Sequence, residues 1–322
     1  MTEKENILRC YRHQIPDHLP DLPKGHQMIL PAGFTEVPPY EQGGLDWFGV
    51  QWRAEKPAAI PDPMAPRVLT DISKWREQVK FPDLEQWDWE KAIIIDKVAA
   101  FDRESKLMEV LIKEGPFERI HSLMGMQEAF VALLTDQEEI EALASAITDF
   151  KCSLINKVAQ YYKPDIINFH DDYGTQKSMM FAPELWRRIF KPLIQKSVAA
   201  CHSHGIFFDL HSCGLIEPII PELVEIGVDC LNCMPINDIP KMKQLTGDKL
   251  TFFTNFDTQK YELEDRTGQL TDNSFRDEIR ETIAAYGKNG NYIPSNRPGE
   301  WWVSRVIAEE LEKMRWTMYP AL

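Results

Sequence analysis

The chain has 322 residues, 43% hydrophobic and 27% charged, a balance that excludes a disordered protein and allows one large barrel domain. Its formal net charge of -14 at pH 7 argues against nucleic acid and membranes as partners. No apolar run approaches the roughly 20 residues that cross a bilayer, and none follows the charged N-terminus, so we expect a cytoplasmic protein.

The first 75 residues are rich in proline and in aromatic side chains and show no clear periodicity. Prolines break long helices and central strands. We therefore expect residues 1–75 to form an ordered N-terminal extension that packs on the barrel, and the whole chain, 1–322, to form a single domain.

From about residue 85, short apolar strands alternate with amphipathic helices, which is typical of α/β proteins. The predicted strands cover residues 107–112, 166–170, 206–211, 230–234, 250–255 and 292–293. The predicted helices cover residues 137–162, 183–204, 216–226, 239–246, 274–287 and 300–319. This alternation predicts a parallel (β/α)8 barrel of the TIM type, and the pattern alone leaves an open doubly wound sheet as the alternative.

Polar or reactive side chains follow several of these strands at their carboxyl ends. They are Asp171, Asp172, His211, Cys213, Cys233, Asn255 and Asp257. A barrel gathers the carboxyl ends of its strands on one rim, where barrel enzymes hold their active sites. The sequence contains neither G-x-G-x-x-G nor G-x-x-x-x-G-K-[ST], so nucleotide binding lacks its main signals.

His211 and Cys213 are separated by one residue, directly after a predicted strand and before Gly214. An imidazole and a thiolate at this spacing can both reach one zinc ion. The same spacing also occurs where a histidine and a buried cysteine merely pack, so the two residues alone leave both interpretations open.

The segments around these residues resemble the uroporphyrinogen decarboxylase superfamily. The stretch 211–214 (His-Ser-Cys-Gly), with 219–223 (Ile-Ile-Pro-Glu-Leu) and 227–229 (Gly-Val-Asp), is most similar to its branch of cobalamin-dependent methyltransferases. The loop 171–174 (Asp-Asp-Tyr-Gly) resembles the active-site loop of the superfamily. The resemblance covers about residues 100–320 and implies a barrel fold and a homodimer.

The resemblance further implies a methyltransferase that works with a corrinoid (cobalamin) cofactor and a small-molecule methyl donor or acceptor. A partner corrinoid protein would carry the cofactor, since this chain has no Asp-x-His-x-x-Gly segment. Zinc would be bound by His211 and Cys213. The superfamily takes a third ligand, a cysteine, from the loop after the last strand, but residues 292–300 contain none. We predict Glu300 as the third metal ligand, with Cys233 or an acidic residue of loop 171–172 as alternatives.

The other predicted site residues lie in the same loops. Asp172, Tyr173 and His211 are predicted to be catalytic, with Asp172 as a proton acceptor or a metal-orienting group. The predicted substrate-binding residues are Asp171, Gln176, Asn255 and Asp257.

Two other functions stay open. The decarboxylases of the superfamily begin with an arginine-rich segment that clamps substrate carboxylates, and residues 8–16 lack that pattern. A metal-free, decarboxylase-like lyase acting on a carboxylated substrate would be active without zinc. A non-catalytic subunit that binds a corrinoid protein would keep its function when His211 and Cys213 are replaced.

Overall fold

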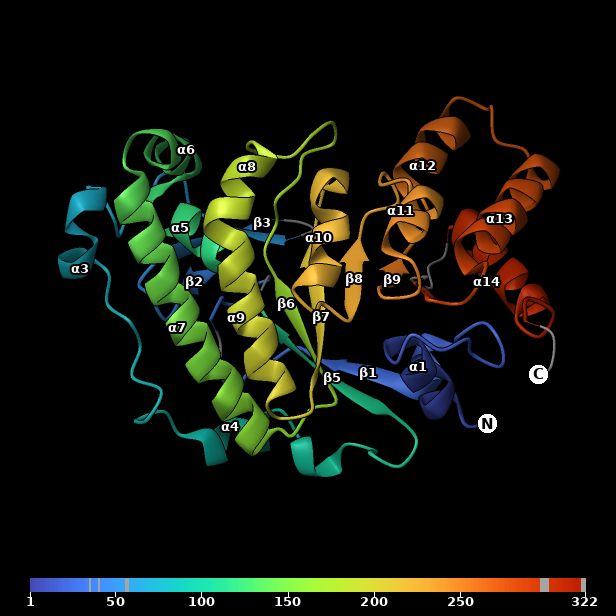
Figure 1. Cartoon of the computed structure of the whole chain (residues 1–322), viewed down its shortest axis with the longest axis horizontal. Helices are drawn as coiled ribbons and strands as arrows, with labels where there is room; N and C mark the ends of the chain where they lie inside the picture. The colour runs from blue at the N-terminus through green and yellow to red at the C-terminus, as the bar shows by residue number, and fades with distance from the viewer. Residues whose placement is uncertain (35, 40, 56–57, 296–300, 320–322) are drawn as a thin grey trace.

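A computed structural model describes residues 1–34, 36–39, 41–55, 58–295 and 301–319 (Figure 1). These residues form an α/β fold around a sheet of seven strands in the order β1-β5-β6-β7-β8-β9-β10. All neighbouring strands in this sheet run parallel. The strands are β1 (His26–Ile29), β5 (Leu107–Ile112), β6 (Ile166–His170), β7 (Phe207–Ser212), β8 (Cys230–Cys233), β9 (Thr251–Thr254) and β10 (Tyr292–Pro294).

Helices connect these strands and cover the outer face of the sheet. Figure 1 shows the two long helices α7 and α9 side by side across that face, and α12, α13 and α14 grouped at one end of the molecule. The longer helices are α1 (Glu3–Tyr11), α4 (Trp89–Ile95), α5 (Pro116–Met124), α6 (Met126–Thr135), α7 (Gln137–Tyr161), α9 (Lys191–His202), α10 (Ile220–Glu225), α11 (Ile239–Thr246), α12 (Thr258–Arg266), α13 (Asp272–Gly287) and α14 (Trp302–Met314). The shorter ones are α2 (Leu22–Gly25), α3 (Trp75–Gln78) and α8 (Pro183–Leu185), which a π-helical turn joins to α9.

The sheet curls around helix α1. The buried side chains Ile7, Cys10 and Tyr11 of this helix share one apolar cluster with residues from β5, β6, β8, β9 and β10. Six flat strands would span about 24 Å at a spacing of about 4.8 Å. Helix α1 has nine residues and is therefore only about 14 Å long. A single short helix can contact all these strands only because the sheet bends around it.

Alternation of side chains along the strands gives the sheet an apolar outer face and a partly polar inner face. The parallel register pairs Asn168 of β6 with Asp209 of β7 on the inner face, and both side chains are buried. The hydroxyl of Tyr11 donates to Asp209 at 3.3 Å. Two residues further along the same strands, the same face carries His170 and His211, so these two histidines lie at the carboxyl ends of neighbouring strands.

The predicted N-terminal extension is not confirmed, because part of this region belongs to the central sheet. It supplies strand β1, which pairs with β5 and so belongs to the central sheet. It also forms a small antiparallel sheet of β2 (Gly44–Leu45), β3 (Gln51–Glu55) and β4 (Ala58–Pro61). The predicted closed barrel has eight strands, whereas the sheet formed by the described residues has seven and ends at β1 and β10.

Within the described ranges, no helix is both long enough and apolar enough to cross a membrane.

Candidate functional site

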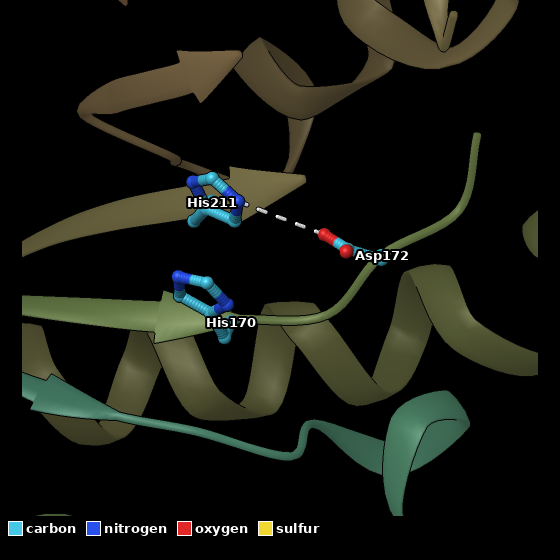
Figure 2. Close-up of side chains that lie close together, drawn as sticks. All are labelled: His170, Asp172 and His211. Carbon is cyan, nitrogen blue, oxygen red and sulfur yellow. Dashed lines mark ion pairs between the residues drawn. The ribbon is translucent and has the colours of Figure 1, made fainter. Parts of the chain in front are cut away.

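Two neighbouring strands share a pattern at their carboxyl ends. In each, a histidine is followed two residues later by an aspartate or a cysteine. Strand β6 ends at His170 and leads to Asp172, and strand β7 carries His211 and leads to Cys213. The register pairs His170 with His211, and their rings stack with centroids 3.8 Å apart (Figure 2). The backbone N–H of Cys213 donates to Asp172 Oδ1 at 2.6 Å. The four residues therefore form one cluster.

Both ring nitrogens of His211 have polar neighbours. Nδ1 lies 2.5 Å from Asn232 Oδ1. With this amide oxygen as the acceptor, the ring proton resides on Nδ1 and Nε2 keeps its lone pair. Nε2 lies 3.3 Å from Cys213 Sγ and 3.7 Å from Asp172 Oδ1. Metal-binding histidines use this arrangement, in which one nitrogen donates a hydrogen bond and the other faces the ion.

The spacing of these donor atoms suits a metal ion. Ligand atoms in a tetrahedral zinc site lie about 3.3–3.8 Å from one another, given bond lengths of about 2.0–2.3 Å. The two distances from His211 Nε2, 3.3 and 3.7 Å, are close to these values. The ligand atoms of His170, Asp172 and His211 all lie within 4.8 Å of one another. The residues therefore fit a divalent metal ion.

Acidic groups gather around this cluster. Burial, with the neighbouring Asp172 and Glu118, raises the pKa of the Cys213 thiol to about 12, so the thiol keeps its proton at neutral pH unless a metal displaces it. Burial and the carboxylates of Asp172 and Glu114 raise the pKa of Glu118 well above its usual range. One carboxylate oxygen of Glu114 is buried without a hydrogen-bond partner. A cation bound here would favour the ionised forms of these groups.

Two glycines hold the loops after β6 and β7 against each other. The N–H of Gly174 donates to the carbonyl of Cys213 at 3.1 Å. A Cβ on Gly214 would lie 2.1 Å from the backbone carbon of Gly174, and Gly214 has a φ of +82°. Only glycine tolerates both the contact and the left-handed backbone. This contact fixes Asp172 beside Cys213.

Gly214→Ala is expected to lower the free energy of unfolding by about 3 kcal/mol or more, because backbone strain of about 1–3 kcal/mol adds to the steric clash. Urea denaturation of the variant and the wild type measures the loss. Gly205→Ala is the matched control, since Gly205 has a φ of +70° but nothing within 4 Å of the added Cβ. Equal losses in the two variants would contradict the close contact.

Asp171 and Tyr173 lie behind this cluster of two histidines, Asp172 and Cys213, and both are fully buried. Asp171 accepts the backbone N–H groups of Phe117 at 3.3 Å and Glu118 at 2.9 Å, at the start of α5. It also accepts the hydroxyl of Tyr173 at 2.5 Å. In the structure these two residues tie helix α5 to the loop after β6. Their roles toward a substrate and in catalysis stay predictions.

The structure does not bring Gln176 and Asp257 into the cluster. Gln176 is exposed and donates to Gln259 at 3.3 Å. Asp257 is the N-cap of helix α12, where its carboxylate accepts the backbone N–H of Lys260 at 3.0 Å. The predicted contacts of Gln176 and Asp257 with a substrate are untested.

Asn255 lies at a separate cavity of about 700 Å³. Other residues that line it are Thr258, Glu262, Asp265, Ser295 and Trp301. Of the metal ligands weighed from the sequence, Cys233 belongs to the apolar cluster on the outer side of the sheet. Glu300 lies outside the described residues, so its role as a ligand stays a prediction.

The sequence was compared with models of known protein families. The model of the uroporphyrinogen decarboxylase (URO-D) family matches residues 67–295, well over half of the sequence. The chain belongs to this family.

A solved methyltransferase structure has a fold similar to that of this uroporphyrinogen decarboxylase family member. A methyltransferase from Methanosarcina mazei matches with a TM-score of 0.65 and 14% sequence identity, over 97% of this chain and 99% of the other. Old Yellow Enzyme from Pichia sp. AKU4542 matches with a TM-score of only 0.39 and 9% identity, over 70% of this chain and 66% of the other. No curated protein sequence matches the chain.

Three residues of the candidate site of this uroporphyrinogen decarboxylase family member are absent from the sequence-based prediction: His170, Asn232 and Glu118. A signal for His170 exists, because its spacing to Asp172 repeats the spacing of His211 and Cys213 on the next strand. Nothing in the sequence marks Asn232 or Glu118. Their proximity depends on the register of β8 and on the placement of α5.

Proposed function

We propose that this protein is a zinc-assisted methyltransferase that moves a methyl group between a small substrate or carrier and a corrinoid cofactor on a partner protein. The observation that most supports this proposal is a pair of donor atoms, Nε2 of His211 and Sγ of Cys213. They lie 3.3 Å apart at the carboxyl end of a strand in the parallel sheet. Membership of the uroporphyrinogen decarboxylase family and the shared fold with a methyltransferase support methyl transfer as the reaction.

The protein's own contribution is to hold and orient the metal. His211 and Cys213 would bind it, Asn232 would keep the imidazole turned toward it, and the contact between Gly174 and Gly214 would fix the two loops. When bound, zinc lowers the pKa of a thiol or hydroxyl group, which makes the sulfur a better methyl acceptor or the oxygen a better leaving group. The corrinoid would carry the methyl group itself.

The charge of the site argues against the metal-free lyase. A carboxylated substrate would meet the acidic side chains of Glu114, Glu118 and Asp172, whereas proteins bind carboxylates with arginine. The buried cations close to Glu114 are Arg119 and Lys151. Both already have ion pairs with other carboxylates. Lys113 adds a positive charge beside His170. The lack of the arginine-rich pattern at residues 8–16 is therefore the stronger point against a carboxylated substrate.

Methyl transfer with free cobalamin tests the proposal. Zinc-loaded protein is incubated with methylcobalamin and a thiol or tetrahydrofolate, and in the reverse direction with cob(I)alamin and methoxylated aromatics, methylamines or methanol. The absorbance of the cobalamin follows the transfer. We expect transfer with at least one substrate class, and its loss after chelation of the metal or in Cys213→Ala. A zinc-loaded wild type that transfers no methyl group with any class would show the proposal to be wrong.

A further inference from the structure

We infer that Asp172 is the third protein ligand of the metal, in place of the cysteine that the family resemblance implies after the last strand. The inference rests on the proposed metal at His211 and Cys213 and completes its ligand set. It makes the site one of mixed chemistry, with one imidazole, one thiolate and one carboxylate, and leaves a fourth position for the substrate.

Asp172 lies in the loop after β6, whereas the other two ligands lie at the end of β7, yet its carboxylate is fixed beside them. Oδ1 accepts the backbone N–H of Cys213 at 2.6 Å and lies 3.7 Å from His211 Nε2. Figure 2 shows this carboxylate facing the ring of His211. A carboxylate oxygen has a second lone pair, so this hydrogen bond positions Asp172 without preventing metal binding.

The imidazole of His170 is close to the ligand atoms of Asp172 and His211, but its ring is not oriented to bind an ion that His211 binds. A metal bound to an imidazole lies in the plane of the ring. The rings of His170 and His211 are nearly parallel, with an angle of 12° and centroids 3.8 Å apart. An ion in the plane of His211 would therefore lie far outside the plane of His170. We assign His170 as a stacking partner that orients His211.

Two further buried acidic side chains lie near Asp172. Glu118 is nine-tenths buried next to Asp172, and Glu114 has a buried carboxylate oxygen without a hydrogen-bond partner. Within the described segments, neither glutamate has an ion pair with lysine or arginine. A divalent ion held by Asp172 would bring positive charge next to these two acidic side chains.

Cobalt substitution tests the ligand assignment without any activity assay. The full-length protein is stripped with a chelator and loaded with Co²⁺, whose thiolate charge-transfer band reports sulfur ligands. Competition with a chromophoric chelator gives the affinity. Asp172→Asn keeps an oxygen that can accept the Cys213 N–H but removes the charge, so we expect its metal affinity to fall by about 100-fold or more. Asp172→Cys should keep the metal and show a charge-transfer band about twice as intense, since that intensity scales with the number of thiolate ligands.

His170→Phe is the matched control, because a phenyl ring preserves the stacking but offers no ligand. Its affinity should stay within about threefold of the wild type, far from the loss expected for a missing ligand. The assignment is overturned if Asp172→Asn binds Co²⁺ as tightly as the wild type, if His170→Phe loses the metal instead, or if the wild type binds none. If instead the proposed function is wrong, the protein will bind the metal but transfer no methyl group.

Discussion

His211→Ala is expected to lose the bound metal and to slow methyl transfer at least about a thousandfold. Metal-ion catalysis contributes several kcal/mol to barrier lowering, and about 4 kcal/mol corresponds to a thousandfold in rate. The fold should survive, because the ring of His211 lies at a strand end and is partly exposed. The free energy of unfolding should change by less than about 1 kcal/mol. Initial rates with cobalamin and the metal content are measured on the same preparations.

Two controls separate metal binding from general damage to the site. Asn232→Ala leaves all ligands in place but removes the hydrogen bond to His211, so metal affinity should fall by about 10–100-fold. His204→Ala removes an exposed histidine whose ring is bonded to Asn156 at 2.9 Å, and should change neither quantity. Retention of both the metal and the rate in His211→Ala would contradict the proposed role of this residue.

Arg119→Met is expected to cause the largest loss of stability, about 3–5 kcal/mol in the free energy of unfolding, because it leaves a buried carboxylate without its partner. Arg119 is fully buried, forms an ion pair with Asp46 at 2.5 Å and lies 4.4 Å from the ring of Phe48. Asp46 also accepts the Trp52 indole N–H at 3.0 Å. The pair thus anchors the small antiparallel sheet to α5. Urea denaturation measures the change.

An exposed ion pair provides the control for Arg119. Arg266 and Glu262 are paired on the surface of α12, so Arg266→Met should cost less than about 1 kcal/mol. Replacing both buried partners, in Arg119→Met with Asp46→Asn, should recover part of the loss, because no uncompensated charge then remains and the amide oxygen can still accept a hydrogen bond. If Arg119→Met and Arg266→Met cost the same, the buried pair does not stabilise the fold as argued.

Most strands from residue 107 onward could be predicted because they are short, apolar and bounded by turn residues. The predicted strand 107–112 coincides with β5, which is buried along its whole length. Helix α11 likewise begins and ends where predicted. Helix α12 was missed because only Tyr261 among its nine residues is buried, so the segment lacks an apolar stripe.

Strand β1 in the N-terminal region was not predicted, because its formation depends on distant residues. Strand β1 has only four residues, two of them polar, and lies between Gly25 and Pro31. It is a strand because it pairs with β5, and because His26 lies 2.5 Å from the buried carboxylate of Glu109. Neither interaction leaves a local sequence pattern.

The candidate site was predicted in part. The pairing of His211 with Cys213 could be predicted because both residues lie on one strand end, where spacing determines proximity. Asp172 was assigned to the site, and the structure places it against both. Its role as a ligand depends on the register between β6 and β7, which the sequence does not specify. The hydrogen bonds that keep Asp171 and Tyr173 buried could not be predicted either, because Asp171 pairs with a distant element, helix α5.

The metal content of the purified protein tests the central claim most directly. Wild type, His211→Ala and Cys213→Ala are each purified in the presence of zinc and analysed by elemental mass spectrometry. We predict about one zinc per chain in the wild type and a loss in both variants, as expected for a site that needs all its protein ligands. A wild type that holds no metal after zinc is supplied, or variants that keep it, would contradict the proposed metal centre.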